Sequence, residues 1–200
     1  MKRLVLASGN PGKIREIGEL LSPLGFQILP QAEVGIPEAE EPHDTFLENA
    51  LAKARHASRA AGLPALADDS GLSVPALGGD PGVHSAYYAG REGDREARDR
   101  RNNEKLLRNL KDDRRAYYTC VMVLVKDAQD PKPLVAEGVW HGEIARAPRG
   151  MNGFGYDPLF YLPTLQKTAA ELDAAHKNRI SHRGLALQKL VALLNESGRR

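Results

Sequence analysis

The sequence predicts an α/β protein, because strand patterns and helix patterns alternate along its 200 residues. Near the start, an apolar run of strand length at 3–8 is followed by a tight turn and by apolar residues at helical spacing up to Leu24. Two long strand patterns come later, at 116–126 and 133–145, and residues 181–197 have the pattern of an amphipathic helix. Alternating elements of this kind are typical of a β-sheet covered by helices.

The elements between these landmarks follow in order from turn and cap signals. Residues 26–30 form a second predicted strand, and a polar, proline-rich loop follows it. Asp44 or Thr45 can cap a helix that ends near Ala61, because Gly62 comes next. Short strands are further expected at 65–69 and 72–77, an ordered glycine-rich loop at 78–90, and the start of a short helix at 168–172.

Residues 91–115 carry ten basic and seven acidic side chains on a helical pattern with an apolar stripe of leucines. This mixture favours a solvated helix face, because a nucleic-acid surface needs mainly one sign of charge. The whole chain is also balanced, with 28 Lys and Arg residues against 26 Asp and Glu residues and a formal net charge of +2. Dedicated nucleic-acid or membrane-surface binding is therefore not expected.

Cysteine content and hydropathy indicate in which cellular compartment the protein is expected. Cys120 is the single cysteine and lies in an apolar strand pattern, so we expect a small core residue and no intramolecular disulfide. The apolar run near the start is too short for a signal peptide, and no stretch approaches the roughly 18 apolar residues of a membrane span. The protein is expected to be soluble and cytoplasmic.

The stretch Ser8–Lys13 (SGNPGK) joins the first predicted strand to the first predicted helix. A glycine-containing turn at a helix start presents free backbone N–H groups and the positive end of the helix dipole to an anion. Lys13 adds a positive charge suited to phosphate, and Ser8 and Asn10 add hydrogen bonds. The spacing is not that of a P-loop. The alternative is a turn that needs Gly12 only for its backbone conformation.

Two adjacent carboxylates, Asp68 and Asp69, follow an apolar run that we expect to end there as a strand. Their repulsion is offset if a divalent cation binds between them, or together with the acidic pair Glu40–Glu41. Hard oxygen ligands suit Mg²⁺, which usually binds together with substrate phosphates. The alternative is an N-cap aspartate followed by a turn aspartate, which the neighbouring Ser70–Gly71 supports. Asn49, on the helix after the acidic loop, is expected to face a polar loop or a ligand.

Two later motifs offer groups for a nucleotide. In GFGYDP (153–158), the glycines let the backbone approach a ligand, and an exposed aromatic side chain can stack on a flat base. In HKNRISHRG (176–184), Lys177, His182 and Arg183 can contact carbonyl oxygens of a base or phosphate oxygens. The alternative for each cation is a solvated surface side chain.

Together these stretches resemble the inosine triphosphate pyrophosphatases, a family that hydrolyses non-standard purine nucleoside triphosphates. The resemblance runs from residue 4 to about 195 and rests on SGNPGK, TFLENALAKA, ADDSGL, GGDPGVHSA, GFGYDP and KNRISHRG. Six motifs in the family's order and at its spacings are far more specific than any one of them.

The resemblance implies a reaction, a fold and a cofactor. Water attacks the α-phosphate of ITP, dITP or XTP in a Mg²⁺-dependent reaction that yields the monophosphate and pyrophosphate. The implied fold is a long twisted mixed β-sheet flanked by helices, in two lobes with an active-site cleft between them. Residues 1–200 would form a single domain. Members of the family usually form homodimers, so a homodimer is implied here as well.

The resemblance also implies residue roles. Asp69 would be the proton acceptor and a metal ligand, and one of Glu40 and Glu41 would supply the second acidic group for the metal. From the motif itself, Asp68 is expected to support the turn or the outer metal shell, and asparagine at either aspartate is expected to leave folding intact. The residues expected to bind the substrate are Ser8, Gly9, Asn10, Pro11, Gly12, Lys13, Ser70, Phe154, Gly155, Tyr156, Asp157, Lys177, His182 and Arg183.

One position departs from the family's pattern. Many relatives read SARY or SARW where this chain reads SAYY, so Tyr87 replaces a cation and puts in doubt a contribution of this loop to phosphate charge or to the dimer contact. Two other classes remain as alternatives: a nucleotide-sensing protein without turnover, and an RNA-binding protein using residues 91–115. Pyrophosphate release separates the first from an enzyme, and salt-dependent gel shifts test the second.

Overall fold

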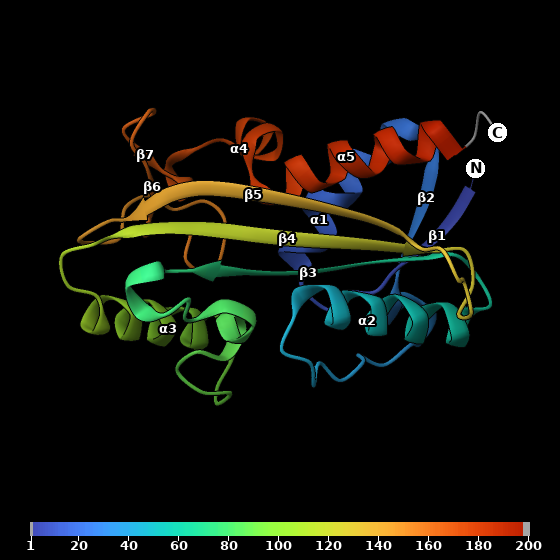
Figure 1. The fold of residues 1–200 in the computed structure, drawn as a ribbon, viewed down its shortest axis with the longest axis horizontal. Helices are drawn as coiled ribbons and strands as arrows, with labels where there is room; N and C mark the ends of the chain where they lie inside the picture. Colours follow the sequence, from blue (N-terminus) through green and yellow to red (C-terminus); the bar gives the residue numbers. More distant parts are fainter. Residues whose placement is uncertain (1, 198–200) are drawn as a thin grey trace. The chain divides into compact units, whose positions relative to one another are not determined.

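The computed structural model describes residues 2–197 and contains both the helices and the strands of an α/β protein (Figure 1). The strands are β1 (Lys2–Leu6), β2 (Phe26–Pro30), β3 (Ala65–Ser73), β4 (Arg115–Val125), β5 (Leu134–Ile144), β6 (Phe160–Leu162) and β7 (Lys167–Thr168). The α-helices are α1 (Pro11–Leu21), α2 (Phe46–Ala61), α3 (Arg95–Asn109), α4 (Ala174–Ile180) and α5 (His182–Ser197). Short 3-10 helices lie at Ser22–Leu24, Gln31–Val34, Pro75–Leu77, Gly82–Tyr87 and Ala169–Glu171.

The strands form a seven-stranded sheet in the order β2-β1-β3-β4-β5-β6-β7. β1 is parallel to both β2 and β3, whereas β6 is antiparallel to both β5 and β7. The sheet is therefore mixed and flanked by helices, as the sequence predicts. None of the helices in the described part of the chain combines the length and the low polarity needed to cross a lipid bilayer.

The chain groups into two compact units. The first consists of Met1–Asp69, Cys120–Gly138 and His182–Arg200, and the second of Ser70–Thr119 and Val139–Ser181. The single domain over residues 1–200 and the cleft between two lobes stay predictions.

In the first unit, helices cover both faces of the strands: α1 and α5 lie on one face and α2 on the other (Figure 1). Successive residues of a strand point to opposite faces, and the cores follow this period of two. Leu4 and Leu6 pack with α1 and α5, whereas Val5 and Ala7 pack with the alanines of α2. Cys120 is fully buried in the first of these cores, so the expectation of a core cysteine is confirmed.

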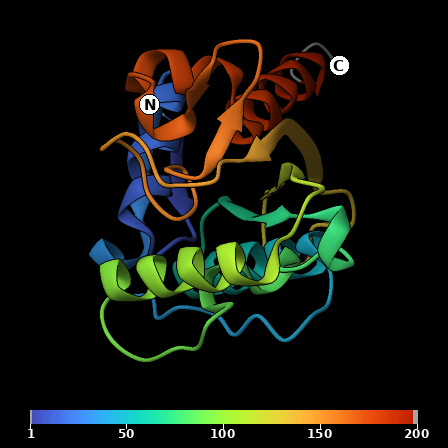
Figure 2. The ribbon, with the colours of Figure 1, turned by 90° about the vertical axis from the view of Figure 1, so that its left-hand side faces the viewer.

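In the second unit, α3 lies along one side of the strands, and it is the yellow-green helix in front in Figure 2. Leu106 of α3 and Leu110, which follows the helix as its C-cap, pack into a core that contains Tyr118, Trp140 and Phe160. The ring of Phe160 lies 4.8 Å from that of Tyr118 and 4.9 Å from that of Trp140, centroid to centroid. These tilted aromatic pairs stabilise the core, and the leucines of α3 pack against it.

Several local predictions need correction. The strand expected to end near Asp69 continues to Ser73, and the strand expected at 72–77 ends in a 3-10 turn, because Pro75 has no N–H for a sheet ladder. The stretch 78–90, expected to be a loop, contains a 3-10 helix at Gly82–Tyr87. The boundaries of α2 are confirmed, since Thr45 caps its start and Gly62 ends it in the left-handed conformation.

Candidate active site

The two aspartates of the ADDSG motif lie inside β3, and their side chains point to opposite faces of the strand. Asp68 faces the same side as Leu66 and Cys120, and Cys120 Sγ lies 3.9 Å from its Oδ2. Asp69 faces the side of α2. Adjacent carboxylates are therefore directed apart, so no metal between them is needed to explain why they are tolerated. The expectation of an N-cap or turn aspartate is wrong, because neither residue is at a strand end.

Asp68 belongs to a buried network of opposite charges. Its Oδ2 lies 2.9 Å from Lys13 Nζ and 3.5 Å from Arg183 Nη2, and the residue is 0% exposed. Burial opposes ionisation of Asp68, but Lys13, Arg183 and Lys53 together outweigh it, so its pKa is lowered. Asp68 is thus a permanent carboxylate that holds two cations.

Arg183 and His182 open α5 and are both buried, at 2% and 4% exposed. The Arg183 guanidinium donates to Glu16 of α1 as well as to Asp68. Burial alone would lower the pKa of Arg183, but Asp68 and Glu16 raise it. The interpretation of Arg183 as a solvated surface cation is therefore wrong. Its role in reading a base stays a prediction.

Asp69 lies among polar groups of α2. Asn49 Nδ2 donates to its Oδ2 at 3.3 Å, and Lys53 Nζ donates to its Oδ1 at 3.1 Å. Burial raises the pKa of Asp69, Lys53 and Lys13 oppose this, and Glu41 adds to it, with a net upward shift. The Asp69 carboxylate is therefore a stronger proton acceptor than an ordinary aspartate.

Asn49 confirms the expectation that it faces a polar loop. Its Oδ1 accepts from His43 N–H and its Nδ2 donates to the His43 carbonyl, both at 3.0 Å. These bonds attach α2 to the acidic loop that carries Glu41. Lys53 was missed at the sequence level, although it lies four residues after Asn49 and therefore on the same helix face.

Lys53 joins the two acidic groups of this site. Its Nζ lies 2.5 Å from Glu41 Oε1 and 3.1 Å from Asp69 Oδ1, so two carboxylate oxygens from separate segments converge on one positive charge. Burial disfavours the charged form of Lys53, but Asp69, Glu41 and Asp68 outweigh it, so its pKa is raised. Glu40 and Glu41 are both exposed, and Glu41 is the one whose carboxylate contacts Lys53.

These oxygens fit a Mg²⁺ that is completed by substrate. Within residues 2–197, no group of three or more His, Cys, Asp or Glu side chains could hold a metal by itself. Mg²⁺ is commonly bound by one or two carboxylates, several waters and substrate phosphates. Asp69 with Glu41 supplies the protein part of such a set, and the metal roles of Asp69, Glu40 and Glu41 stay predictions.

The SGNPGK stretch forms the start of α1, with Pro11 as its first residue. Asn10 Oδ1 accepts from the N–H groups of Gly12 at 2.9 Å and Lys13 at 3.2 Å. The expectation of free N–H groups is therefore wrong for Gly12 and Lys13, because the N-cap side chain satisfies both. Ser8 is buried, and its Oγ accepts from Asn10 N–H at 3.2 Å. Gly9 lies against the Glu38 carboxylate, which occupies the place of a Cβ.

In the second unit, the GFGYDP loop is held by its own aspartate. Asp157 is buried and its Oδ2 accepts from Phe154 N–H at 2.8 Å and from Lys177 Nζ at 2.6 Å. At Gly153, with φ +78°, a Cβ would lie 2.1 Å from that same oxygen, so glycine is required. Lys177 is buried, at 5% exposed, and is therefore not a solvated cation.

The two aromatic residues of this loop differ in exposure. Tyr156 is buried and its hydroxyl donates to the Ser85 carbonyl at 2.9 Å, so it serves the loop and the core. Phe154 is half-buried, with Lys177 Nζ 5.0 Å and Arg95 Cζ 5.2 Å from its ring centroid. Phe154 is therefore the aromatic ring of this motif that a ligand can reach. Arg95 was missed at the sequence level, because its segment has the composition of a solvated helix.

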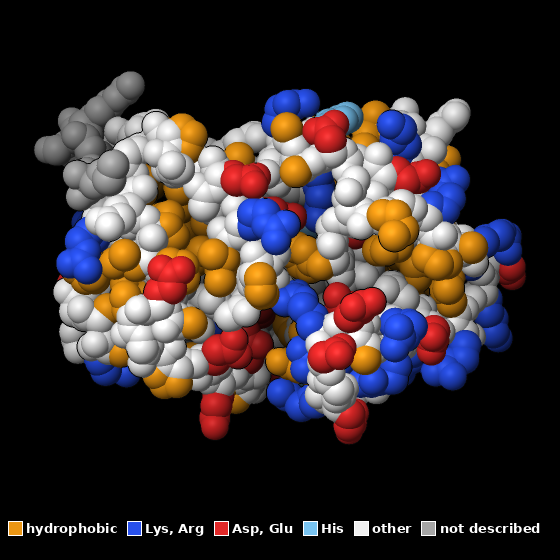
Figure 3. Space-filling view, turned by 180° about the vertical axis from the view of Figure 1, so that it is seen from behind, with side chains coloured by type: hydrophobic (Ala, Val, Ile, Leu, Met, Phe, Trp, Pro, Cys, Tyr) orange, Lys and Arg blue, Asp and Glu red, His pale blue; other side chains and the backbone are white. Residues whose placement is uncertain are grey.

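Ser70 lies on β3 and is half-buried. Tyr87, which replaces the family's usual cation, carries the Arg91 guanidinium 4.1 Å and the Arg98 guanidinium 5.5 Å from its ring centroid. Positive charge is therefore present at Tyr87 although the residue itself is neutral. On the face seen in Figure 3, Lys and Arg side chains are interspersed with Asp and Glu side chains.

Helices on a mixed sheet, with a buried carboxylate facing lysine and asparagine side chains, define an α/β protein with a candidate acid–base site. The comparison with known proteins defines it further: residues 4–193 match the Ham1 family, and the chain belongs to this family. The family prediction is thereby confirmed.

Individual relatives cover nearly the whole chain. A protein of Burkholderia pseudomallei named dITP/XTP pyrophosphatase is 64% identical over 97% of this chain and 94% of its own length. A protein of the same name from Nitrosomonas europaea is 58% identical over 98% of this chain and 96% of its own length. Among solved structures, a HAM1 protein from Coxiella burnetii is 51% identical, with a TM-score of 0.89, covering 98% of this chain and 100% of that chain.

Proposed function

We propose that this chain hydrolyses the non-standard purine nucleoside triphosphates dITP, ITP and XTP to the monophosphate and pyrophosphate. The observation that carries this proposal is the match of 97% of the chain, at 64% identity, to a protein named dITP/XTP pyrophosphatase. A nucleotide sensor without turnover is not favoured, because the relatives are named as enzymes and a binder needs no buried, basic carboxylate such as Asp69.

In this proposal Asp69 accepts the proton of the attacking water. Asn49 holds one of its oxygens and Lys53 the other, so the carboxylate is oriented from both sides. Burial raises its pKa, which favours proton acceptance relative to an exposed aspartate. Asn49 and Lys53 act as positioning residues, because each donates a hydrogen bond to the Asp69 carboxylate, the proposed general base.

The proposed cofactor is Mg²⁺, held by Asp69 together with Glu41, or with Glu40 as the alternative. When bound there, it supplies positive charge for the phosphoryl oxygens as the α-phosphate is attacked. The convergence of Asp69 and Glu41 on Lys53 Nζ supports this assignment, because the two carboxylates create a negative potential that attracts a cation. Separate Glu40→Gln and Glu41→Gln variants decide between the two glutamates.

The remaining assignments concern the substrate. We assign the triphosphate to Ser8–Lys13, where Asp68 fixes the Lys13 side chain, and the base to the Phe154–Asp157 loop with Lys177, His182 and Arg183. Hypoxanthine and xanthine carry a 6-keto acceptor where adenine has a donor, so a pocket of donors rejects adenine. Guanine, which shares the 6-keto group, would be excluded through its 2-amino group. A homodimer, a cytoplasmic location and a single domain over residues 1–200 complete the proposal on the basis of the family resemblance.

A panel of nucleoside triphosphates tests the proposal. Purified protein is incubated with dITP, XTP, dATP or dGTP, with and without Mg²⁺, and products are separated by ion-exchange chromatography. We expect monophosphate and pyrophosphate from dITP and XTP, much less product from dATP and dGTP, and none without a divalent cation. Orthophosphate with diphosphate as the nucleotide product would contradict the proposal, because a different bond would have been broken.

A further inference from the structure

We infer that Asp99 and Asn103 of α3 are positioning residues that clamp the Phe154–Gly155 segment and thereby set recognition of the base. The inference rests on the proposed function, in which this loop contacts the base. It assigns a recognition role to the mixed-charge helix that composition alone marks as a solvated surface.

The clamp begins with the geometry of α3. Arg95, Asp99 and Asn103 are spaced by four residues, so their side chains lie along one face of the helix. Arg95 Nε lies 4.0 Å from Asp99 Oδ2, and Asn103 Nδ2 donates to the Asp99 carbonyl at 2.9 Å. The three side chains therefore form one connected stripe.

This stripe satisfies both backbone groups of Gly155. The Gly155 N–H donates to Asp99 Oδ2 at 2.9 Å, and the Gly155 carbonyl accepts from Asn103 Nδ2 at 2.9 Å. Gly155 has φ +63°, in the left-handed region that favours glycine, and lies outside the strands and helices. Two side chains that precede it by more than fifty residues hold this glycine in place.

The residue before Gly155 is fixed on both sides as well. Phe154 N–H donates to Asp157 Oδ2 at 2.8 Å, and the Arg95 guanidinium lies 5.2 Å from the Phe154 ring centroid. The backbone that carries the ring is therefore held at two points. The Phe154 N–H is bound to Asp157, and Gly155 is bound to α3. Any displacement of the backbone that carries the ring requires the loss of at least one of these hydrogen bonds.

The contact of Asn103 with Gly155 comes with a cost to the stability of the fold. Its Oδ1 is buried and accepts no hydrogen bond from the described residues, so the polar atom loses hydration without compensation. A leucine of similar size would avoid that loss. The presence of an asparagine at this position is therefore explained by its Nδ2, which donates hydrogen bonds to the carbonyls of Gly155 and Asp99.

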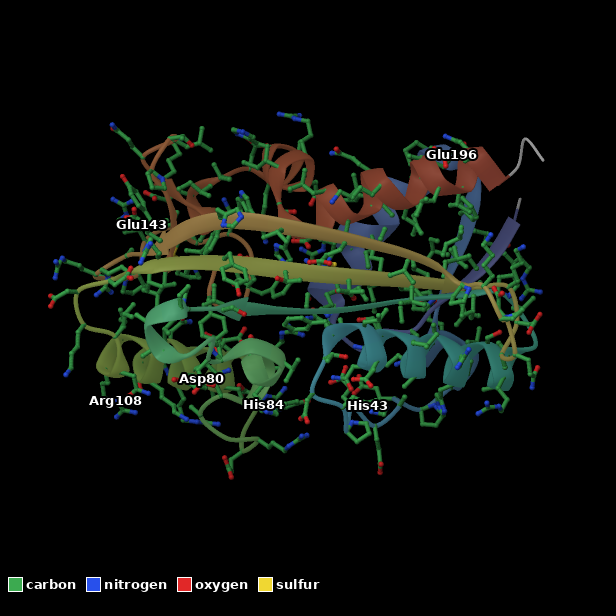
Figure 4. All side chains as sticks on the ribbon, viewed as in Figure 1. His43, Asp80, His84, Arg108, Glu143 and Glu196 are labelled. Carbon is green, nitrogen blue, oxygen red and sulfur yellow. The ribbon has the colours of Figure 1, made fainter. Side chains whose placement is uncertain are left out.

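The experiment compares variants on one helix. Asn103→Leu and Asp99→Ala remove the two bonds, and Asp99→Asn keeps an acceptor oxygen for the Gly155 N–H. Glu104→Gln and Arg108→Ala change charge at exposed positions of the same helix, and Figure 4 shows Arg108 directed away from the strands. Each variant is measured for backbone hydrogen exchange over residues 153–157, for thermal stability, and for kcat and KM with dITP and dATP.

We expect faster exchange over residues 153–157 in Asn103→Leu and Asp99→Ala, with the Tm of Asn103→Leu close to wild type. The KM for dITP should rise about tenfold and the dITP/dATP preference should fall about tenfold, with a smaller change in kcat. Asp99→Ala removes a hydrogen bond to a charged acceptor and Asn103→Leu removes a neutral one, and both bonds hold the same glycine. Asp99→Asn should retain most of the wild-type values, and both control variants all of them.

Two results would overturn the inference. Unchanged exchange over residues 153–157 in both variants would mean that α3 does not hold the loop. Faster exchange with unchanged KM and unchanged preference would mean that the clamp does not serve recognition. Failure of the proposed function is separate, because it would appear as wild-type protein that does not hydrolyse dITP, and hydrogen exchange would then still decide whether the clamp exists.

Discussion

Asparagine at Asp68 is expected to lower stability and asparagine at Asp69 to lower turnover, although the two residues are adjacent. The buried contacts of Asp68 thereby correct the expectation from sequence that asparagine at either aspartate leaves folding intact. Asp68 is 0% exposed and lies between Lys13 and Arg183, so Asp68→Asn leaves buried positive charge without its counter-charge. Breaking a buried ion pair costs about 3–5 kcal/mol, and an amide oxygen that still accepts a hydrogen bond favours the lower end, about 3 kcal/mol. In a chain of this size that corresponds to a fall in Tm of about 6–12 °C.

Asp69→Asn should leave the fold nearly unchanged. The raised pKa of Asp69 means that the folded protein disfavours its negative charge, so removal of that charge relieves a cost. Lys53 keeps Glu41 as its partner. Activity should nevertheless fall by roughly 10²–10⁴-fold, because the general base is lost.

The assay is a thermal melt and a kcat measurement at saturating Mg²⁺ for both variants in the same buffer. We expect Asp68→Asn to lose stability and Asp69→Asn to lose turnover with an unchanged melt. If Asp69→Asn keeps wild-type kcat, or loses activity only because it unfolds, Asp69 is not the base. If Asp68→Asn melts like wild type, the buried network of Lys13 and Arg183 does not depend on it.

Three further outcomes are expected. Arg183→Ala should lower stability by about 3–5 kcal/mol, because the buried Asp68 and the half-buried Glu16 lose their shared partner; a wild-type melt with a reduced dITP/dATP preference would instead favour direct reading of the base. A chelator should abolish activity and leave the circular dichroism spectrum unchanged, since no described cluster of three ligands could hold a structural metal, and loss of helix signal would contradict this. Burial opposes ionisation of Asp130, but the N–H groups of Lys126 and Lys132 outweigh it and lower its pKa, so its stabilisation is complete above about pH 4 and is lost at lower pH. Asp130→Asn should therefore weaken the dependence of Tm on pH in the acid range, and an unchanged dependence would contradict the role of these bonds.

Much of the fold could be predicted because local signals agree with the final structure. The cap at Thr45 and the stop at Gly62 define α2 from sequence alone, and the two long apolar runs coincide with β4 and β5. The strand through Asp68 and Asp69 was placed too short, since two charges and a glycine resemble a turn. Partners that follow much later in the chain, such as Arg183 for Asp68, compensate those charges, and periodicity carries no information about them.

The candidate site could be predicted in part. The motifs identify Asp69, Lys13 and the Phe154 loop, and the polar setting of Asn49 follows from its poor fit to a helix. Lys53 and Asn103 were not identified, because lysine and asparagine on mixed-charge helices are usually solvated. Their proposed roles rest on contacts with segments distant in sequence, namely the acidic loop and the GFGYDP loop. The free N–H groups expected at the start of α1 were wrong for a local reason, because Asn10 turns back to cap them.

The position of the isotope from labelled water tests the central claim most directly. The protein is incubated with dITP and Mg²⁺ in water enriched in ¹⁸O, and the products are analysed by mass spectrometry. Attack of water at the α-phosphorus, with Asp69 as base, predicts one ¹⁸O atom in the monophosphate and none in pyrophosphate. Label in pyrophosphate, or in released orthophosphate, would show attack at another phosphorus and would contradict the account.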